Sequence, residues 1–268
     1  MRAPLYAEYA PAPELAEYVH CVWTFSAAHD PAPQRIAPDG RPELIVHLGE
    51  PYLERRASGD VVQAPVLFAG QLTAPLALVA QSHVQVLGVR FHAHAARAFL
   101  GADASMAADR RLDLAALHGG AVVKLRRDVS ESSSSNHQLQ RVQQYVLQRV
   151  GIARADADVR NAVEALFARG EATRPEHIGE RVWQRRFKAE VGVSARMLQS
   201  VLRFRRVFDA IEREEKAGWV EAALAAGYFD QPQMARDFRR FLGVTAREWA
   251  QQKAGLAKAL TETYKTAG

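Results

Sequence analysis

Amide and guanidinium side chains cluster near the C-terminus, and both groups can read base edges in duplex DNA. If the segment 231–240 is a helix, five of these residues point more or less outward: Gln231, Gln233, Arg236, Arg239 and Arg240. Gln pairs with adenine and Arg with guanine through two hydrogen bonds, each pair giving about 1–3 kcal/mol of discrimination. The pattern favours a helix that lies in the major groove, although a solvated helix face could carry the same residues.

A second basic stripe lies upstream in 178–192. Four of its residues recur at i, i+3, i+4 and i+7 and so share one helix face: Arg181, Gln184, Arg185 and Lys188. A stripe with almost no carboxylate favours groove binding over a surface of salt bridges. The stretch 195–215 between the two stripes has the apolar spacing of a helix roughly 30 Å long. That length would let two recognition helices enter successive major grooves on one face of the duplex.

The residues around the C-terminal stripe predict a helix-turn-helix. Trp219, Ala223 and Leu224 have the spacing of a buried face on its first helix, and Gly227 marks a sharp turn. Asp230 is a suitable N-cap for the second helix. The inward face of that helix is predicted to consist of Met234, Phe238 and Phe241. A second predicted core face, on the upstream helix, consists of Val182, Trp183 and Phe187.

Charge and composition agree with a nucleic-acid partner. The net charge is +5 over 268 residues, and it divides into −1 for residues 1–130 and +6 for residues 131–268. A basic excess confined to one half is expected of a domain that binds a polyanion. We find no run of 18 apolar residues and no signal-peptide pattern, and the single cysteine, Cys21, is predicted to be a buried structural thiol. These features predict a cytoplasmic protein that does not associate with a membrane.

The chain divides into a strand-rich half and a helical half. Short Val- and Leu-rich runs punctuated by Gly and Pro precede a Ser-rich segment, 130–137, whereas helical periodicity follows it. We therefore predict an α+β fold with a β-barrel or sandwich-like domain followed by an all-α double helix-turn-helix (homeodomain-like) domain. The predicted boundaries are residues 1–128 for the β-rich domain, 129–138 for a flexible linker, 139–256 for the helical domain and 257–268 for a tail.

The helical half resembles the AraC/XylS family of transcriptional regulators. The similarity runs from about residue 155 to 252 and is carried by RRFKAEVGVSARMLQSVLRFRRV (185–207) and by Gly227 to Trp249, with Ala246 in place of the usual proline. The resemblance implies sequence-specific binding of double-stranded DNA. It places base-reading positions at Arg181, Gln184 and Arg185 in the first unit, and at Gln231, Gln233 and Arg236 in the second.

The N-terminal half resembles the small β-rich sensor-like domain of a subgroup of this family. In such proteins this domain binds an effector or mediates dimerisation. The resemblance therefore leaves a small-molecule effector, RNA polymerase and a second copy of the chain open as further partners. Asp39, Arg41 and Glu43, around a Pro-Asp-Gly turn, could bind a ligand, although a solvated turn is the simpler interpretation.

The first unit departs from the family pattern. Only ATRPEHIGER separates the helix that ends near Gly170 from the basic stripe, so about six or seven residues around 177–178 are missing. We expect this unit to be truncated, with its recognition helix supported by the 158–169 helix. The second unit is then expected to do most of the reading.

Histidines provide the one enzyme-like pattern. His92 and His94, with His47 and His83 elsewhere, could contribute to a metal site in a β-barrel, but no carboxylate follows His94 before Asp103. Surface or capping histidines are the simpler interpretation. The sequence shows no catalytic motif, and we expect no enzyme activity, metal or cofactor. The alternatives are a metal-dependent β-barrel enzyme or ligand-binding protein with a degenerate DNA-binding tail, and a regulator that acts through protein contacts alone.

Overall fold

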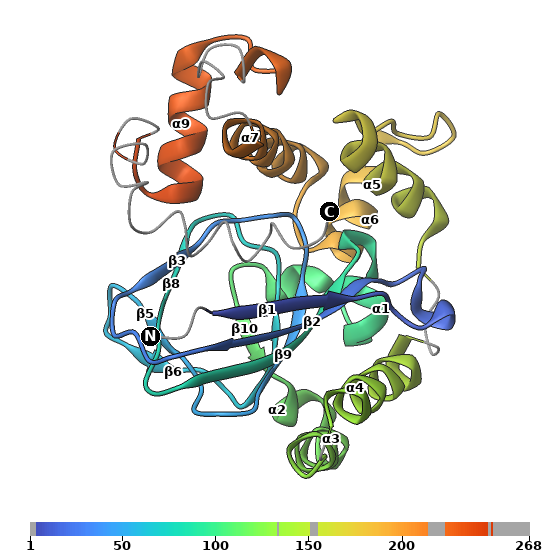
Figure 1. The fold of residues 1–268 in the computed structure, drawn as a ribbon. Coiled ribbons are helices and arrows are strands. Elements are labelled where there is room, and N and C mark those ends of the chain that lie inside the picture. Colours follow the sequence, from blue (N-terminus) through green and yellow to red (C-terminus); the bar gives the residue numbers. More distant parts are fainter. Residues whose placement is uncertain (1–3, 133, 151–154, 214–222, 246–247, 249–268) are drawn as a thin grey trace.

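The computed structural model describes residues 4–132, 134–150, 155–213, 223–245 and 248, without the side chains of 210–213. Two antiparallel sheets form the N-terminal region, and helices surround it (Figure 1). The six-stranded sheet contains, in spatial order, β1 (Leu5–Tyr9), β2 (Val19–Ala27), β9 (Val84–Phe91), β4 (Glu43–His47), β7 (Val66–Ala69) and β10 (Arg111–Asp113). The four-stranded sheet contains β3 (Gln34–Ile36), β8 (Leu76–Val79), β5 (Leu53–Arg55) and β6 (Val61–Val62).

Strand β9 separates two apolar layers through the period-two alternation of its side chains. Leu87 and Val89 belong to a large core that also includes helical residues, whereas Val84 and Val86 pack with Tyr52 in a separate cluster. A Cβ atom at Gly88 would lie 2.1 Å from the ring of Trp23. Glycine is therefore required where Trp23 of β2 faces Gly88 of β9.

The helices are α1 (Ala96–Leu100), α2 (Leu114–His118), α3 (Gly120–Ser130), α4 (Ser135–Val150), α5 (Ala157–Arg169), α6 (Glu180–Val191), α7 (Ala195–Arg213) and α9 (Gln231–Leu242). Short 3-10 turns are η1 (Pro13–Leu15), η2 (Ala93–Ala95) and η3 (Ala104–Ala107). The prediction of a β-rich domain followed by a helical domain is confirmed. Within the described residues no helix is long and apolar enough to cross a membrane.

The segment 130–137 differs from the expected flexible linker. Helix α3 runs to Ser130 and α4 starts at Ser135, so serines end one helix and begin the next. Val142, Tyr145 and Val146 of α4 lie in the same core as the sheet residues Leu44 and Phe68. The apolar face of α4 explains the difference, because it can be buried only against the N-terminal domain. We therefore propose that the domain boundary lies after Val150, in place of the boundary expected at 129–138.

The helical region forms two adjoining cores. Helices α5, α6 and α7 share one of them through Val163, Leu166, Trp183, Phe187 and Leu198. Helices α7 and α9 share the other through aromatic side chains, with the Phe204 ring 5.1 Å from that of Phe238 and 5.3 Å from that of Phe241. Figure 1 shows α7 and α9 on the opposite side of the β domain from α3 and α4.

Candidate nucleic-acid interface

Helix α9 starts and ends where the sequence predicts. Asp230 caps its N-terminus, since its Oδ1 accepts the backbone N–H of Gln233 at 2.6 Å. Pro232 lies in the first turn, where a missing N–H costs no helical hydrogen bond. The preceding turn contains Gly227 with φ of +88°, and the helix ends at Gly243 with φ of +73°. Both positions need the left-handed backbone that glycine adopts readily.

The side chains of α9 divide as predicted. Met234, Phe238 and Phe241 are buried. The outward residues Gln231, Arg236, Arg239 and Arg240 are exposed, and Gln233 is half-buried. The Oε1 atom of Gln233 accepts the backbone N–H of Phe229 at 3.4 Å, which orients its amide.

Of the first helix of this unit, predicted at 219–226, residues 223–226 are described. Ala223 is buried as predicted, but the prediction that Leu224 shares this face was wrong, because its side chain is 63% exposed and is turned about 100° from that of Ala223. Trp219 lies outside the described residues, as do most of the helix predicted at 245–256 and the tail at 257–268.

Arg240 has a contact outside its own domain. Its Nε atom donates to the backbone carbonyl of Thr73 at 3.3 Å. Arg35 on β3 in turn donates to the carbonyl of Leu242 at 3.3 Å. The C-terminal end of α9 is therefore in contact with the β domain. Gln231 lies at the other end of the helix, whereas Arg236 lies one turn before Arg240.

Sequence reasoning missed the group that anchors α9 to α7. Asp237 Oδ2 accepts from Arg203 of α7 at 3.2 Å and from the Tyr228 hydroxyl at 2.9 Å. The Arg203 guanidinium lies over the Tyr228 ring, 4.6 Å from its centre. Burial and the neighbouring carboxylate raise the pKa of Tyr228, so its hydroxyl stays a donor. An acidic residue nine positions after a Tyr in the turn, opposite an Arg on the linking helix, could have been a signal.

Helix α6 presents the predicted basic stripe. Arg181, Gln184, Arg185 and Lys188 are all exposed. The amide of Gln184 donates to Glu180 Oε1 at 2.6 Å, one turn earlier. The inner face contains Trp183 and Phe187, both buried.

Val182 was assigned to that inner face, and this prediction was wrong because its side chain is 44% exposed. It directly precedes the buried Trp183, and the helix turns its side chain about 100° away from that residue.

Helix α5 supports α6 directly. Between Arg169 and Glu180 the chain forms no helix, and Gly170 ends α5 in a left-handed conformation. Arg186 of α6 is held at the start of α5, where its guanidinium bonds Asp156 at 2.7 Å and Asp158 at 3.0 Å. The inner face of α6 also touches the β domain, since Arg97 of α1 pairs with the buried Glu190 at 2.8 Å.

The histidines of the metal hypothesis do not converge on one point. His92 and His94 stack in parallel with ring centres 5.5 Å apart, and His94 Nε2 lies 3.0 Å from the carbonyl oxygen of Glu17. His83 instead lies beside Ser26, and His47 packs against Tyr52. In the described part of the chain no three His, Cys, Asp or Glu residues are grouped so that they could hold a metal ion.

The Pro-Asp-Gly turn is less solvated than expected. Asp39 Oδ1 accepts the backbone N–H of Arg41 at 2.9 Å, the usual bond of such a turn. Asp39, Arg41 and Glu43 all line a cavity between the two sheets. Cys21 is buried, as predicted, and burial raises the pKa of its thiol to about 11.

Phe229 is a surface residue that sequence reasoning did not single out. Its side chain is 89% exposed and directly precedes the N-cap Asp230. An aromatic ring this exposed, at the end of the helix that faces away from the β domain, is well placed for an apolar contact to a partner. Its position beside Gln231 was visible in the sequence, but its outward orientation was not.

Comparison with known proteins finds one domain in the β-rich part of the chain and another in the helical part. A domain of unknown function, DUF6597, matches residues 7–113. A helix-turn-helix domain matches residues 174–252, a span that contains α6, α7 and α9. No curated protein matches the chain. Among solved structures, a point variant of apo ToxT from Vibrio cholerae aligns over 93% of this chain and 97% of its own, at 11% identity and a TM-score of 0.42.

Proposed function

We propose that this chain is a DNA-binding transcription regulator of the AraC type, and that α9 does most of its sequence reading. The helix-turn-helix domain that matches residues 174–252 supports the DNA-binding role. The observation that carries the proposal is the geometry of α9. Its N-terminal end is capped and free of the β domain, and it presents Gln231, Gln233 and Arg236. The N-terminal residues of a recognition helix are those that reach base edges in the major groove.

Each exposed side chain of α9 has a role suited to its chemistry. Gln231 would pair with adenine through both its amide oxygen and its amide N–H, and Arg236 with guanine. Gln233 would donate its amide N–H to a base edge, because its oxygen accepts from Phe229. Arg239 and Arg240, about two turns after Gln231 and Gln233, would contact phosphates and set the register of the helix on the duplex. Arg240 would exchange the Thr73 carbonyl for a phosphate oxygen. Phe229 would pack against a thymine methyl group beside the first base pair read.

Helix α6 has a weaker role in this proposal. Arg181, Gln184, Arg185 and Lys188 form an exposed stripe that suits an adjacent major groove. Its unit lacks a scaffold helix in segment 171–179, and α5 supports it instead. The amide of Gln184 is already engaged by Glu180, which reduces its freedom to pair with a base. Helix α6 would therefore add phosphate contacts and affinity more than base selectivity.

The β-rich domain would control this DNA-binding activity. A small-molecule effector in the cavity between the sheets is the proposed input, and RNA polymerase and a second copy of the chain are the proposed protein partners. We propose that the chain acts in the cytoplasm and catalyses no reaction. A metal-dependent enzyme is not favoured, because His47 and His83 lie apart from the stacked pair His92 and His94.

Salt-dependent binding to a 40-base-pair duplex of random sequence tests the proposal. We expect the logarithm of the association constant to fall linearly with the logarithm of salt concentration, by roughly 0.9 for each phosphate neutralised. Replacing Arg239 and Arg240 with Ala should lower this slope by about two, whereas the exposed pair Arg55 and Arg56 on the β domain serves as the control. An association constant that does not change with salt concentration would contradict the proposal and favour a regulator that acts through protein contacts.

A further inference from the structure

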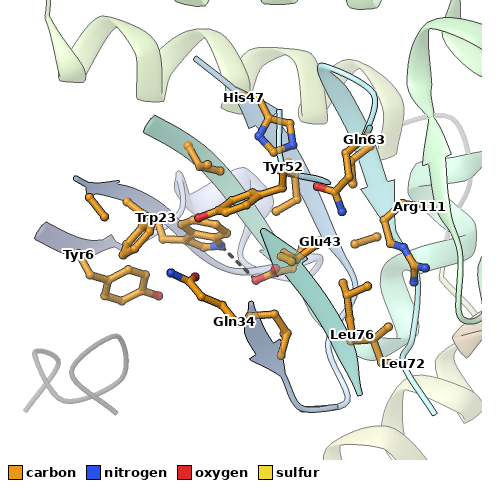
Figure 2. A pocket seen from close by; sticks show the side chains of 18 of the residues that line it. Tyr6, Trp23, Gln34, Glu43, His47, Tyr52, Gln63, Leu72, Leu76 and Arg111 are labelled. Carbon is orange, nitrogen blue, oxygen red and sulfur yellow. Dashed lines mark hydrogen bonds between the residues drawn. The ribbon is translucent and has the colours of Figure 1, made fainter. Parts of the chain in front are cut away.

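The β domain encloses a cavity of about 480 Å³ between its two sheets. Such a volume is typical of sites for small organic molecules. Figure 2 shows Tyr6 and Trp23 on one side of the cavity and Leu72 and Leu76 on another, with Tyr52 between the strands. These rings and aliphatic chains make the wall mainly apolar, which suits a flat or branched hydrocarbon skeleton.

Two guanidinium groups of the wall, those of Arg90 and Arg111, are paired with carboxylates, and that of Arg41 lies over the Phe167 ring of α5, 4.3 Å from its centre. Arg90 donates to Glu43 and to Glu8, each at 2.9 Å, and Trp23 donates to the same oxygen of Glu43 at 3.1 Å. Arg111 donates to the buried Glu54 at 2.7 Å. A ligand charge placed here would find its opposite partners already engaged, and burying an unpaired charge is costly. The cavity therefore favours an uncharged ligand.

One polar side chain in the wall is not neutralised in this way. His47 is 1% exposed, and neither ring nitrogen has a hydrogen-bond partner among the described residues. Gln63 faces the ring closely enough to oppose the fall in its pKa, which burial nevertheless lowers to about 4. The neutral ring offers one donor and one acceptor. A buried polar group without a partner costs about 1–3 kcal/mol, which a ligand group that bonds to it would recover.

We propose that this cavity binds one uncharged, mainly apolar small molecule that carries a hydroxyl, carbonyl or amide group for His47. The inference rests on the proposed role of the β domain as the effector-binding part of the regulator, and names the class of that effector. We expect charged molecules of similar size to bind less tightly, because Arg90 and Arg111 of the wall already have partners of opposite charge.

Some segments of the β domain contact the cavity and the helices α7 and α9 through neighbouring residues. Along β3, Gln34 and Ile36 line the cavity, whereas Arg35 between them bonds the last carbonyl of α9. In the segment before β8, Leu72 lines the cavity and Thr73 accepts from Arg240.

The Pro-Asp-Gly turn repeats this arrangement. Asp39 and Arg41 line the cavity, and a Cβ atom at Gly40 between them would lie 2.9 Å from Leu198 of α7. A ligand that shifted these segments would therefore act directly on α7 and α9.

Calorimetric titration of the full chain with three matched naphthalenes tests the ligand class. The probes are 2-naphthylmethanol, 2-naphthoate and 2-naphthylmethylammonium, which share one ring system and differ in charge. We expect one molecule of the alcohol to bind per chain, at least tenfold more tightly than either ion. Equal or tighter binding of an ion, or no binding of the alcohol, would overturn the proposal.

Variants place the binding in this cavity. Leu78→Trp fills it from β8 and should abolish binding of the alcohol, whereas Val62→Trp, at an exposed position of β6, should not. His47→Phe should weaken the binding of the alcohol about tenfold but change the affinity for 2-methylnaphthalene less than twofold. Only the alcohol can form a hydrogen bond with the imidazole. Equal losses for both probes would contradict the role of His47, and unchanged binding by Leu78→Trp would place the ligand elsewhere.

Duplex DNA binding, measured on the same samples, reports folding and separates the two proposals. A chain that binds DNA but shows no preference for the alcohol overturns the ligand class alone. A chain that selects the alcohol but does not bind DNA overturns the proposed function instead.

Discussion

At the scale of single residues, Arg236 has the most directly testable proposed role. Its guanidinium is exposed on the face of α9 that projects away from Met234 and Phe238, and it lies one turn after Gln233. We expect Arg236→Ala to weaken binding to a selected site by about 1–3 kcal/mol, roughly tenfold to a hundredfold, and to relax the preference at one base pair. Equilibrium binding to the selected site and to its single-base variants measures both effects.

Arg127→Ala is the matched control, because Arg127 is an exposed arginine on α3 far from α9. An Arg236→Ala chain that keeps its affinity and its base preference would remove Arg236 from the interface.

The buried His47 predicts a loss of stability in mild acid. Its pKa falls from 6.5 to about 4 in the folded chain, first because of burial and also because of Arg126. Between about pH 6.5 and pH 4 the unfolded chain therefore binds a proton that the folded chain does not. The free energy of unfolding should fall across this range, by on the order of 1–2 kcal/mol from this group at pH 5.

Urea denaturation of the full chain at pH 7 and pH 5 measures the change. His47→Gln should reduce the difference between the two pH values, since glutamine does not titrate. An identical difference in the variant would show that other groups cause the acid sensitivity.

At the scale of elements, the cluster of Asp237, Arg203 and Tyr228 fixes how α9 is held against α7. Arg203 and Asp237 are mostly buried, with 17% and 15% of their side chains exposed. Removing one partner leaves the other without its counter-charge. We expect Asp237→Asn to lower the free energy of unfolding by about 1–3 kcal/mol. A double-mutant cycle with Arg203→Met measures the coupling, and additive effects would exclude a direct interaction.

The elements could be predicted from the sequence wherever one face of a helix is buried within its own domain. Met234, Phe238 and Phe241 define α9, and Asp230 and Gly243 define its ends. Contacts across long sequence separations could not be predicted. Arg35 and Leu242 are far apart in the chain, and no periodicity connects them. The cavity was also beyond prediction, because its wall combines residues from both sheets that only the topology brings together.

At the scale of the whole molecule, α3 and α4 belong with the β domain. The apolar side of α4, including Tyr145 and Val146, is buried against the sheet core. We expect a fragment of residues 1–150 to unfold cooperatively on heating, and a fragment of residues 1–128 to lack that transition because it leaves this core open to water. Calorimetry of the two fragments measures the difference. If both fragments show the same unfolding transition, the domain boundary lies at the Ser-rich segment, as the sequence predicts.

Helices α6 and α9 lie against the β domain at both ends of the helical region. Glu190 of α6 pairs with Arg97, and Leu242 of α9 accepts from Arg35. The exposed stripes nevertheless remain on the outer faces of α6 and α9, joined by a 19-residue helix about 28 Å long. One turn of duplex spans a similar length, so both stripes could face the same side of the DNA.

Selection of bound sequences from random duplex DNA tests the central claim most directly. If α9 does most of the reading, the selected sites should share one strongly specified block confined to a single major groove. Arg236→Ala should erase part of that block, and Arg185→Ala should leave it intact while lowering affinity. Two equally specified blocks one helical turn apart, or a block erased by Arg185→Ala and not by Arg236→Ala, would contradict this account.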